Sequence, residues 1–498
     1  MIALERLRYT YPESPRPALL DLDLTIAGGE CVLVGGVSGS GKSTLLRAIN
    51  GLVPHFYGGR FGGRAIVAGL DTRLARPQVL AAHVGTVFQD HPSRFLTASV
   101  EEEVAFSLEV AVSDPRRIPA RVREVVDRLG VAELAGRQLD RLSAGEQARL
   151  AIAAAAARGP RILVLDEPVT HIDPSGAQAV VHWVEQMARQ DGVTVVVAEH
   201  RSETWAQAVD RRVRLAPTGA IEDAAAERRA PEVEPSVWDH VAPPTSAGLR
   251  ARGLQVAFNG RSVLRGIDLD LEPGEIVALV GRNGSGKTTL LRSLMGILPA
   301  QAGDVQVGRA SIRGRPVRET ARRIGYVPQA PSSMLFADTV ADEIGLTLGQ
   351  HGRAARSAVE PWLESFGLRG LADRYPRDLS AGERQRLALA VVLAAGRPIL
   401  LLDEPTLGMD RPRLAWLGAM LDAFRRAGAA ILLATHDAAF VADYATRAIL
   451  LSGGRVAAQG TPVDVLDADP AFADALRRWR VEAMGEATTA RVGHADDR

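Results

Sequence analysis

Short, mostly apolar runs recur along the chain at residues 162–165, 194–198, 276–280, 399–402 and 431–434. Each run has four or five residues, ends next to charged or turn-forming residues, and shows no alternation of polar and apolar positions. Strands of this kind are buried on both faces, as in a parallel sheet covered by helices. Helical stretches lie between the runs, so the pattern predicts an α/β fold.

Two segments have the pattern of a helix start. The sequence LSAGE stands at residues 142–146 and again at 379–383. Ser as the N-cap and Glu three residues later predict a capping box. The first turn of such a helix also offers free N–H groups and a hydroxyl that can bind phosphate. The same residues can therefore cap a helix and bind a phosphate, so the two interpretations are compatible.

These segments belong to a repeat of about 240 residues. The sequence GVSGSGKS at 36–43 returns as GRNGSGKT at 281–288, and LVLDEP at 163–168 returns as LLLDEP at 400–405. The serine of LSAGE and the glutamate of DEP are 24 positions apart in both halves. A period this long indicates duplicated whole domains, because solenoid repeats run only about 20–50 residues.

The composition of the chain suggests where these domains end. Residues 223–247 are rich in Ala, Glu and Pro, which is typical of a linker. We therefore predict a first domain at 1–222 and a second at 248–470. Residues 471–498 end in a polar stretch and are expected to form a frayed tail.

The two glycine-rich segments predict phosphate-binding loops. Glycines let the backbone curl so that successive N–H groups point inward, and the following helix adds its positive end. The lysine reaches the outer phosphates, and the Ser or Thr hydroxyl can ligate Mg²⁺. The alternative is a plain flexible loop before a helix, which two matched copies make untenable. The candidate residues are Gly36, Ser38, Gly39, Gly41, Lys42, Ser43 and Thr44, and then Gly281, Asn283, Gly284, Gly286, Lys287, Thr288 and Thr289.

An acidic pair ends one apolar run in each half, as Asp166-Glu167 and Asp403-Glu404. Carboxylates at that point lie at the carboxyl edge of a parallel sheet, where ligands bind. The Asp can hold Mg²⁺, and the Glu can act as general base toward the attacking water. The alternative is a solvated acidic turn.

His200 and His436 follow later apolar runs, 33 and 32 residues after the respective glutamates. Alone, each would be read as an ordinary histidine at the end of a strand. The matched spacing instead favours contact with the terminal phosphate of a nucleotide.

The order of these motifs resembles that of ABC ATPases over nearly the whole chain except linker and tail. The family signature Leu-Ser-Gly-Gly-Gln reads LSAGE in both halves here. The resemblance implies two P-loop NTPase domains in tandem, each with a parallel core sheet, an antiparallel β-subdomain and a helical subdomain. It also implies ATP and Mg²⁺ as ligands.

Further roles come from the same resemblance. Gln89 and Gln329 match the Q-loop, which contacts Mg²⁺ and senses the membrane partner. Asp173 and Asp410 match the D-loop, and Tyr11 and Phe258 match the aromatic residue that stacks on adenine, with core packing as the alternative.

In the family, two domains dimerise head to tail, with ATP between one P-loop and the other signature. The resemblance therefore pairs the P-loop residues, Glu167 and His200 of the first half with Ser380 and Gly382. Ser143 and Gly145 would serve the P-loop of the second half. Because Lys, Glu and His are present in both sets, we expect both sites to hydrolyse ATP.

Composition narrows the cellular setting. The 59 basic and 59 acidic side chains cancel, so no broad positive field for nucleic acid is expected. The single cysteine, Cys31, cannot form an intrachain disulfide, which fits a reducing compartment. No apolar stretch of about 18 residues is present, and residues 1–11 lack a signal-peptide pattern. A membrane role would therefore need other subunits.

Two segments resemble the ATPases of energy-coupling-factor importers, namely TASVEEEVAF at 97–106 and AEHR at 198–201, with a looser second copy of the former at 331–344. The fused pair looks most like importers for thiamine precursors or cobalt. This implies a shared transmembrane subunit, whose arginines the acidic run could meet, and a substrate-binding membrane protein. The chain would then lie at the cytoplasmic face of the plasma membrane.

Two alternatives differ from the importer. A ribosome-associated tandem ABC ATPase typically has a long, charged helical linker, whereas residues 223–247 are short and broken by prolines. A DNA-repair ATPase of the same superfamily would need zinc-binding cysteines, and the chain has one cysteine. The cargo cannot be read from the sequence, because its specificity would lie in a separate subunit.

Overall fold

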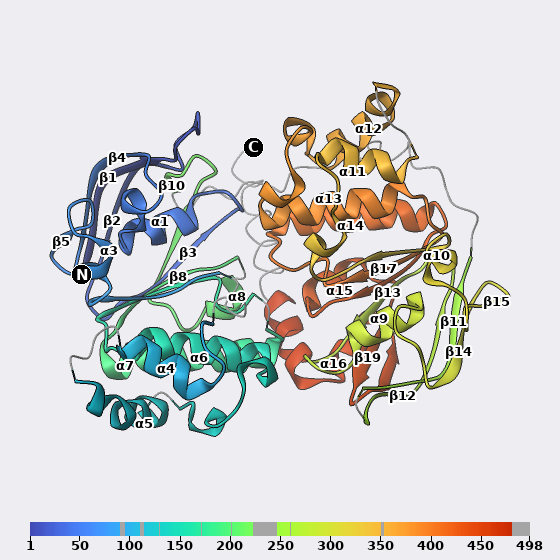
Figure 1. Cartoon of the computed structure of the whole chain (residues 1–498), viewed down its shortest axis with the longest axis horizontal. Helices are drawn as coiled ribbons and strands as arrows, with labels where there is room; N and C mark the ends of the chain where they lie inside the picture. Colours follow the sequence, from blue (N-terminus) through green and yellow to red (C-terminus); the bar gives the residue numbers. More distant parts are fainter. Residues whose placement is uncertain are drawn as a thin grey trace, which may run out of the picture. The chain divides into compact units, whose positions relative to one another are not determined.

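The fold is taken from a computed structural model of the chain (Figure 1). It describes residues 1–89, 95–109, 114–128, 130–170, 172–200, 202–222, 247–258, 260–349 and 353–480. The chain divides into two compact units, Met1–Arg229 and Ala230–Arg498. The predicted linker lies outside the described residues except for Ala247.

Two sheets form the first unit. The antiparallel sheet has the order β2-β1-β4-β5, and the central sheet has the order β10-β9-β3-β8-β7-β6. Neighbouring strands of the central sheet are parallel except β10 with β9. The strands are β1 (Ile2–Thr10), β2 (Leu19–Ile26), β3 (Cys31–Gly36), β4 (Arg60–Val67), β5 (Leu70–Asp71), β6 (Val84–Val87), β7 (Ile162–Asp166), β8 (Thr194–Ala198), β9 (Arg211–Leu215) and β10 (Ile221–Glu222).

The second unit repeats this plan. Its antiparallel sheet has the order β12-β11-β14-β15, and its central sheet has the order β16-β17-β18-β13-β19-β20, with only β20 antiparallel to its neighbour. The strands are β11 (Leu249–Phe258), β12 (Arg261–Leu271), β13 (Ile276–Val280), β14 (Ala302–Val307), β15 (Ala310–Ser311), β16 (Ile324–Val327), β17 (Ile399–Asp403), β18 (Ala430–Ala434), β19 (Arg447–Ser452) and β20 (Arg455–Gly460). The α/β architecture predicted from the apolar runs is confirmed.

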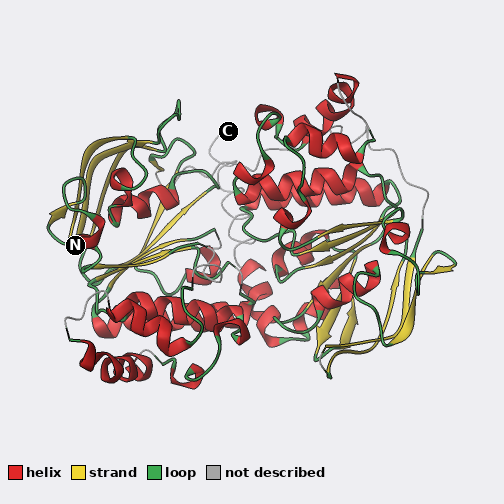
Figure 2. Cartoon of the chain, viewed as in Figure 1, coloured by secondary structure: helices red, strands yellow, loops and turns green. Residues whose placement is uncertain are grey.

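Helices cover the central sheets (Figure 2). In the first unit they are α1 (Lys42–Ile49), α2 (Leu52–His55), α3 (Pro77–Leu80), α4 (Val100–Glu109), α5 (Ile118–Arg128), α6 (Ala144–Ala156), α7 (Pro174–Asp191) and α8 (Ser202–Trp205). In the second they are α9 (Lys287–Met295), α10 (Val317–Thr320), α11 (Val340–Thr347), α12 (Arg353–Ser365), α13 (Ala381–Ala394), α14 (Arg411–Arg426), α15 (Ala438–Tyr444) and α16 (Pro462–Asp467).

Strands β3, β7 and β8 each contribute to two hydrophobic cores, one on each face of the central sheet. In β7, Leu163 and Leu165 belong to the core with α4, α6 and α7, whereas Ile162 and Val164 belong to the core with α1 and the antiparallel sheet. All five residues of the strand are buried. This double burial explains why the sequence runs show no alternation.

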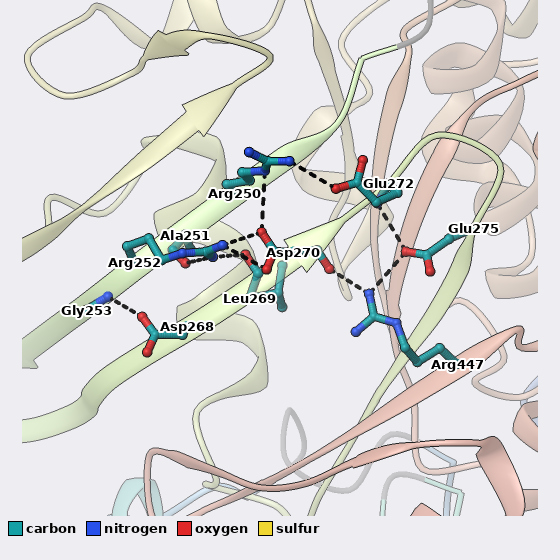
Figure 3. A network of polar contacts seen from close by, with 10 residues as sticks. All are labelled: Arg250, Ala251, Arg252, Gly253, Asp268, Leu269, Asp270, Glu272, Glu275 and Arg447. Carbon is teal, nitrogen blue, oxygen red and sulfur yellow. Dashed lines mark hydrogen bonds and ion pairs between the residues drawn. The ribbon is translucent and has the colours of Figure 1, made fainter.

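A charged network joins the antiparallel sheet of the second unit to its central sheet (Figure 3). Arg447 at the start of β19 donates to the Asp270 carbonyl (2.6 Å) and pairs with Glu275 (3.1 Å). In the first unit, Arg211 likewise donates to the Thr25 carbonyl (2.5 Å) and pairs with Glu30 (2.8 Å). In each unit, then, one arginine contacts both a carbonyl of the antiparallel sheet and a glutamate next to the central sheet. We call this arrangement the arginine clamp and assign it to the framework that holds the two sheets of each unit together.

The end of the second domain differs from the sequence prediction. Residues 470–480 are helical, although a frayed tail was expected from residue 471 onward. Phe472 and Leu476 are fully buried among side chains that include Val280, Val441 and Leu450. The fold therefore continues to at least residue 480, and residues 481–498 of the predicted tail lie outside the described residues.

Among the described residues, no helix combines the length and the hydropathy that a membrane span requires.

Candidate active sites

The first glycine-rich loop connects β3 to α1, as its sequence predicts. Gly36 and Gly41 have φ of 143° and 97°, and a Cβ at either would come within 2.6 Å of a backbone oxygen. Only glycine fits these positions without strain. The loop wraps the buried Lys42, whose Nζ donates to the carbonyls of Gly36 (2.8 Å) and Val37 (3.2 Å).

The second loop, between β13 and α9, has the same construction. Gly281 has φ of 153°, and Gly284 and Gly286 have φ of 76° and 108°. Lys287 is 7% exposed and donates to the Gly281 carbonyl at 2.7 Å. Each loop thus leads into a helix whose first residue is the lysine, an arrangement suited to binding an anion.

A hydroxyl and a carboxylate meet beside each loop. The Ser43 hydroxyl donates to Asp166 (3.1 Å), and the Thr288 hydroxyl donates to Asp403 (3.2 Å). Burial, followed by the charge of Glu167, raises the pKa of Asp166 to about 6. Burial also raises the pKa of Asp403. A buried carboxylate with a raised pKa and a hydroxyl beside it form a pair of oxygen donors that a further cation would stabilise.

The next residue of the first domain, Glu167, is enclosed by polar groups. Its Oε1 lies 3.1 Å from His200 Nε2, and its Oε2 accepts from Gln89 Nε2 at 2.9 Å. Burial opposes ionisation of Glu167, but the hydrogen bond and charge of His200, helped by Lys42, outweigh burial and lower the pKa. His200 Nδ1 is in turn 3.5 Å from Lys42 Nζ. The structure therefore brings Lys42, Glu167, His200 and Gln89 together.

The second domain assembles a related but different group. Glu404 Oε2 lies 2.9 Å from His436 Nδ1, and Glu404 Oε1 lies 3.8 Å from Lys287 Nζ. Tyr326 adds a hydroxyl that donates to Asp403 at 3.3 Å. Gln329, the counterpart of Gln89, is exposed. The imidazole thus meets the glutamate through Nδ1 here and through Nε2 in the first domain.

Both glutamates have a left-handed backbone, with φ of 50° at Glu167 and 52° at Glu404. This conformation is uncommon for residues other than glycine, and strained backbone of this kind is enriched at functional sites. The same outlier in both domains marks the strand ends that carry the acidic pairs.

The LSAGE segments form the predicted capping boxes. The Ser143 hydroxyl caps α6 by accepting from the Glu146 amide, and Glu146 accepts from the Ser143 amide. Ser380 and Glu383 do the same at α13. Gly145 and Gly382 lie in the first turns of these helices, so the remaining N–H groups there stay close to the surface.

The D-loop candidates also cap helices. Asp173 accepts from the Gly176 amide at the start of α7, and Asp410 accepts from the Arg413 amide at the start of α14. The sequence did not anticipate this capping role. It shows that both aspartates hold the loops that follow the acidic pairs.

The two aromatic candidates have different surroundings. The Tyr11 hydroxyl lies 3.2 Å from Thr44 Oγ1 and accepts from Arg47 at 2.7 Å, and its ring packs edge-on against Tyr9 and Tyr57. The Phe258 side chain is 44% exposed. Tyr11 is therefore hydrogen-bonded to the helix that follows the P-loop, whereas Phe258 is an exposed aromatic side chain at the end of β11.

The glutamates of the run at residues 101–103 are engaged within the domain. Glu101, Glu102 and Glu103 accept from the amides of Gly136, Ser99 and Thr97 respectively. Glu103 is buried as well. These contacts favour the helix-start interpretation of the acidic run over the expected contact with arginines of a partner.

Sequence reasoning missed several residues around the sites, among them Arg47, Thr170, Glu199 and Tyr326. The Thr170 hydroxyl contacts Glu167 (3.2 Å), and the buried Glu199 accepts from the His200 amide (2.9 Å). A signal for Glu199 was present, since it directly follows a buried strand beside a candidate histidine.

These loops, acidic strand ends and doubly covered sheets define a protein with two P-loop nucleotide-binding domains. The ABC transporter family matches residues 19–170 and 264–407, so both domains are covered. By these matches and the relatives below, the chain belongs to the ABC transporter family, as an ATP-binding transporter subunit and ATPase with two ABC domains in tandem.

Full-length relatives support this assignment. A "Putative ABC transporter ATP-binding protein" of Streptomyces avermitilis is 39% identical over 540 residues, covering 95% of this chain and 96% of that protein. The "Putative HMP/thiamine import ATP-binding protein YkoD" of Bacillus subtilis is 30% identical over 506 residues, covering 93% and 92%. A solved structure, cbiO1 from Clostridium perfringens, described as part of the ABC transporter complex cbiONQ, aligns with 51% of this chain and 100% of its own, at 27% identity and a TM-score of 0.42.

Proposed function

We propose that the chain energises a membrane importer by hydrolysing Mg·ATP at two sites. The observation that carries the proposal is the duplicated set of lysine, hydroxyl, aspartate, glutamate and histidine around each glycine-rich loop. In each set the hydroxyl contacts the aspartate, and the glutamate contacts the histidine.

In this proposal, the lysine, glutamate and histidine of each set have different roles in ATP hydrolysis. Lys42 and Lys287 bind the outer phosphates, with the loop amides around them. Glu167 and Glu404 are the general bases, which orient the attacking water and accept its proton. His200 and His436 contact the terminal phosphate, and each steadies its glutamate through the ring nitrogen that faces it.

A magnesium ion fits the oxygen donors beside each loop. Ser43 with Asp166, and Thr288 with Asp403, offer a hydroxyl and a carboxylate, and Gln89 and Gln329 offer amide oxygens. The raised pKa of Asp166 indicates a carboxylate that a cation would stabilise. Magnesium accepts such oxygen ligands and, when bound, neutralises charge on the phosphates.

Each site is completed by the other domain in this proposal. In it, the Ser380 hydroxyl and the Gly382 amide at the start of α13 face the nucleotide held by Lys42, and the Ser143 hydroxyl and the Gly145 amide at the start of α6 face the nucleotide held by Lys287. Capped helix starts with free N–H groups are suitable ligands for a terminal phosphate. In the same proposal, Tyr11 and Phe258 stack on the adenines. Asp173 and Asp410 form the D-loops, which follow the general bases in the sequence.

A duplicated apolar pair supports docking to membrane subunits. Leu96 and Phe106 are 70% and 41% exposed, and Phe336 and Leu346 at the matching positions are 77% and 54% exposed. The buried Glu103 and Glu343 hold the loops in place by accepting from the amides of Leu96 (3.1 Å) and Phe336 (2.7 Å). Each pair has one exposed apolar side chain on a loop and one on the helix that follows, and such apolar surface favours binding to apolar partner helices.

The importer class rests on sequence likeness. The relative from Bacillus subtilis is named as an HMP/thiamine import ATP-binding protein, and the TASVEEEVAF and AEHR segments resemble energy-coupling-factor ATPases. We therefore propose a vitamin, thiamine-precursor or cobalt importer with a shared transmembrane subunit and a substrate-binding membrane protein. The chain would act at the cytoplasmic face of the plasma membrane.

Affinity purification from detergent-solubilised native membranes tests this function. The tagged chain should bring down integral membrane proteins, and the double variant Leu96→Asp with Phe336→Asp should lose them while still binding ATP. Leu74→Asp, at a 75% exposed position outside these loops, is the matched control and should retain them. Recovery of ribosomes instead of membrane proteins would favour the soluble tandem ATPase and contradict the importer.

A further inference from the structure

The proposed general base of the first domain lies next to a second buried acid. Thr170 Oγ1 is 3.2 Å from Glu167 Oε2 and 3.4 Å from Glu199 Oε1. All three side chains are at most 8% exposed, and Glu199 is 1% exposed. A hydroxyl has one proton to donate, so Thr170 bridges two carboxylates that both compete for it.

Glu199 Oε1 has a second contact, since it accepts from the His200 amide at 2.9 Å. The His200 ring then reaches the other oxygen of Glu167, with Nε2 at 3.1 Å from Oε1. One oxygen of Glu199 therefore contacts both Thr170 and His200, which lie against different oxygens of Glu167, while Gln89 also donates to Oε2. Because these groups are buried, little water is present to replace a lost contact.

The second domain lacks this arrangement. Leu407 stands three residues after Glu404, as Thr170 does after Glu167, and Thr435 directly precedes His436, as Glu199 directly precedes His200. Thr435 Oγ1 instead pairs with Thr406 Oγ1 at 2.6 Å. Glu404 lies 2.9 Å from His436 and 3.8 Å from Lys287, and Leu407, at the position that matches Thr170, has no hydroxyl.

We infer that Glu199 and Thr170 are positioning residues that orient Glu167, and that they make the two hydrolytic sites of the chain chemically unequal. The inference rests on the proposed role of Glu167. The first site therefore needs the acceptor oxygen of Glu199 for ATP turnover but not for nucleotide binding. The second site has Leu407 and Thr435 at the corresponding positions and therefore does not depend on this pair.

The test compares Glu199→Met, which removes the acceptor at similar length, with Glu199→Gln, which keeps an acceptor oxygen at the same place. Misplacing a catalytic group by about 1 Å lowers turnover by up to about a hundredfold. We therefore expect Glu199→Met to lower kcat of the first site by roughly tenfold with KM within about twofold, and Glu199→Gln to keep most of the rate.

The measurement uses the full chain in a Glu404→Gln background, so that turnover comes from the first site. If Glu404→Gln alone abolishes turnover, the two sites are strictly coupled, and the Glu199 variants are then measured in the otherwise unchanged chain. Thr170→Val with Thr170→Ser provides a second pair, should Glu199→Met fail to fold. The valine variant should lose rate and the serine variant should regain it.

Two results would overturn the inference. One is that Glu199→Met and Thr170→Val turn over as fast as the parent, while Glu167→Gln in the same assay is slow. The other is that Glu199→Met raises KM as much as it lowers kcat. If Glu167→Gln itself turns over at the parental rate, the proposed role of Glu167 fails instead, so the two failures are distinguishable.

Discussion

Asp166 carries a buried charge that is unfavourable in the nucleotide-free protein. Its pKa is raised to about 6 from the usual 3.8, mainly by burial. Between these values the folded protein holds a proton that the unfolded chain has lost, so stability falls as the pH rises through this window. The destabilisation is complete above about pH 6 and absent below about pH 4.

Asp166→Asn should therefore stabilise the nucleotide-free protein at pH 7.5. Two pKa units correspond to at most about 3 kcal/mol. Thermal unfolding of the first domain should shift upward at pH 7.5 and remain almost unchanged at pH 4, whereas Mg·ATP hydrolysis should fall. Asp474→Asn, at an exposed position, is the control and should change neither curve. An equal shift at both pH values would exclude the charge as the cause.

The acidic pairs also permit a test of both sites separately. Glu167→Gln and Glu404→Gln should each reduce steady-state ATP hydrolysis, because an amide cannot accept the proton of the attacking water. Nucleotide affinity should stay close to that of the parent, since neither glutamate is proposed to bind the phosphates. A variant that hydrolyses ATP at the parental rate would remove its glutamate from the role of general base.

At the scale of single residues, the sequence predicted those members of the sites that belong to contiguous motifs. Lys42, Asp166, Glu167 and His200 were found because strand ends and a glycine-rich loop mark their positions, and the structure brings them together. Thr170 was missed, because its contact with Glu199 spans 29 positions and depends on how two loops fold over the sheet edge. No local pattern contains that information.

At the scale of elements, the helix at residues 470–480 shows the limit of pattern reading. Phe472, Leu476 and Trp479 have the i, i+4, i+7 spacing of one helical face, but three apolar positions before a polar end are a weak signal. What makes them core residues is the apolar surface of Val280 and Leu450, which distant strands provide. The central strands were predicted correctly because their own residues reveal double burial.

Phe472→Ala should destabilise the second domain by about 3–5 kcal/mol, the usual effect of removing a buried aromatic side chain. Chemical denaturation of the full chain should show a lower midpoint for the second domain. Arg477→Ala on the exposed face of the same helix should stay within about 0.5 kcal/mol of the parent. Equal stability of both variants would mean that residues 470–480 do not pack on the domain.

At the scale of the whole molecule, the two domains share one framework and differ in their sites. The same strand orders, capping boxes and arginine clamps occur twice. A lysine and a histidine lie near the proposed general base in both domains, but Gln89 and Thr170 also contact Glu167, and the two imidazoles meet their glutamates through different nitrogens. The duplication was evident from sequence spacing, but the unequal surroundings required coordinates.

The central claim is that two lysine-containing loops bind and hydrolyse ATP. Steady-state ATP hydrolysis by the purified chain with both Lys42→Ala and Lys287→Ala tests it most directly, with thermal unfolding as the check that the variant is folded. We predict a folded protein whose hydrolysis falls to background, because both anchors of the outer phosphates are gone. A folded double variant that consumes ATP at the parental rate would contradict the account.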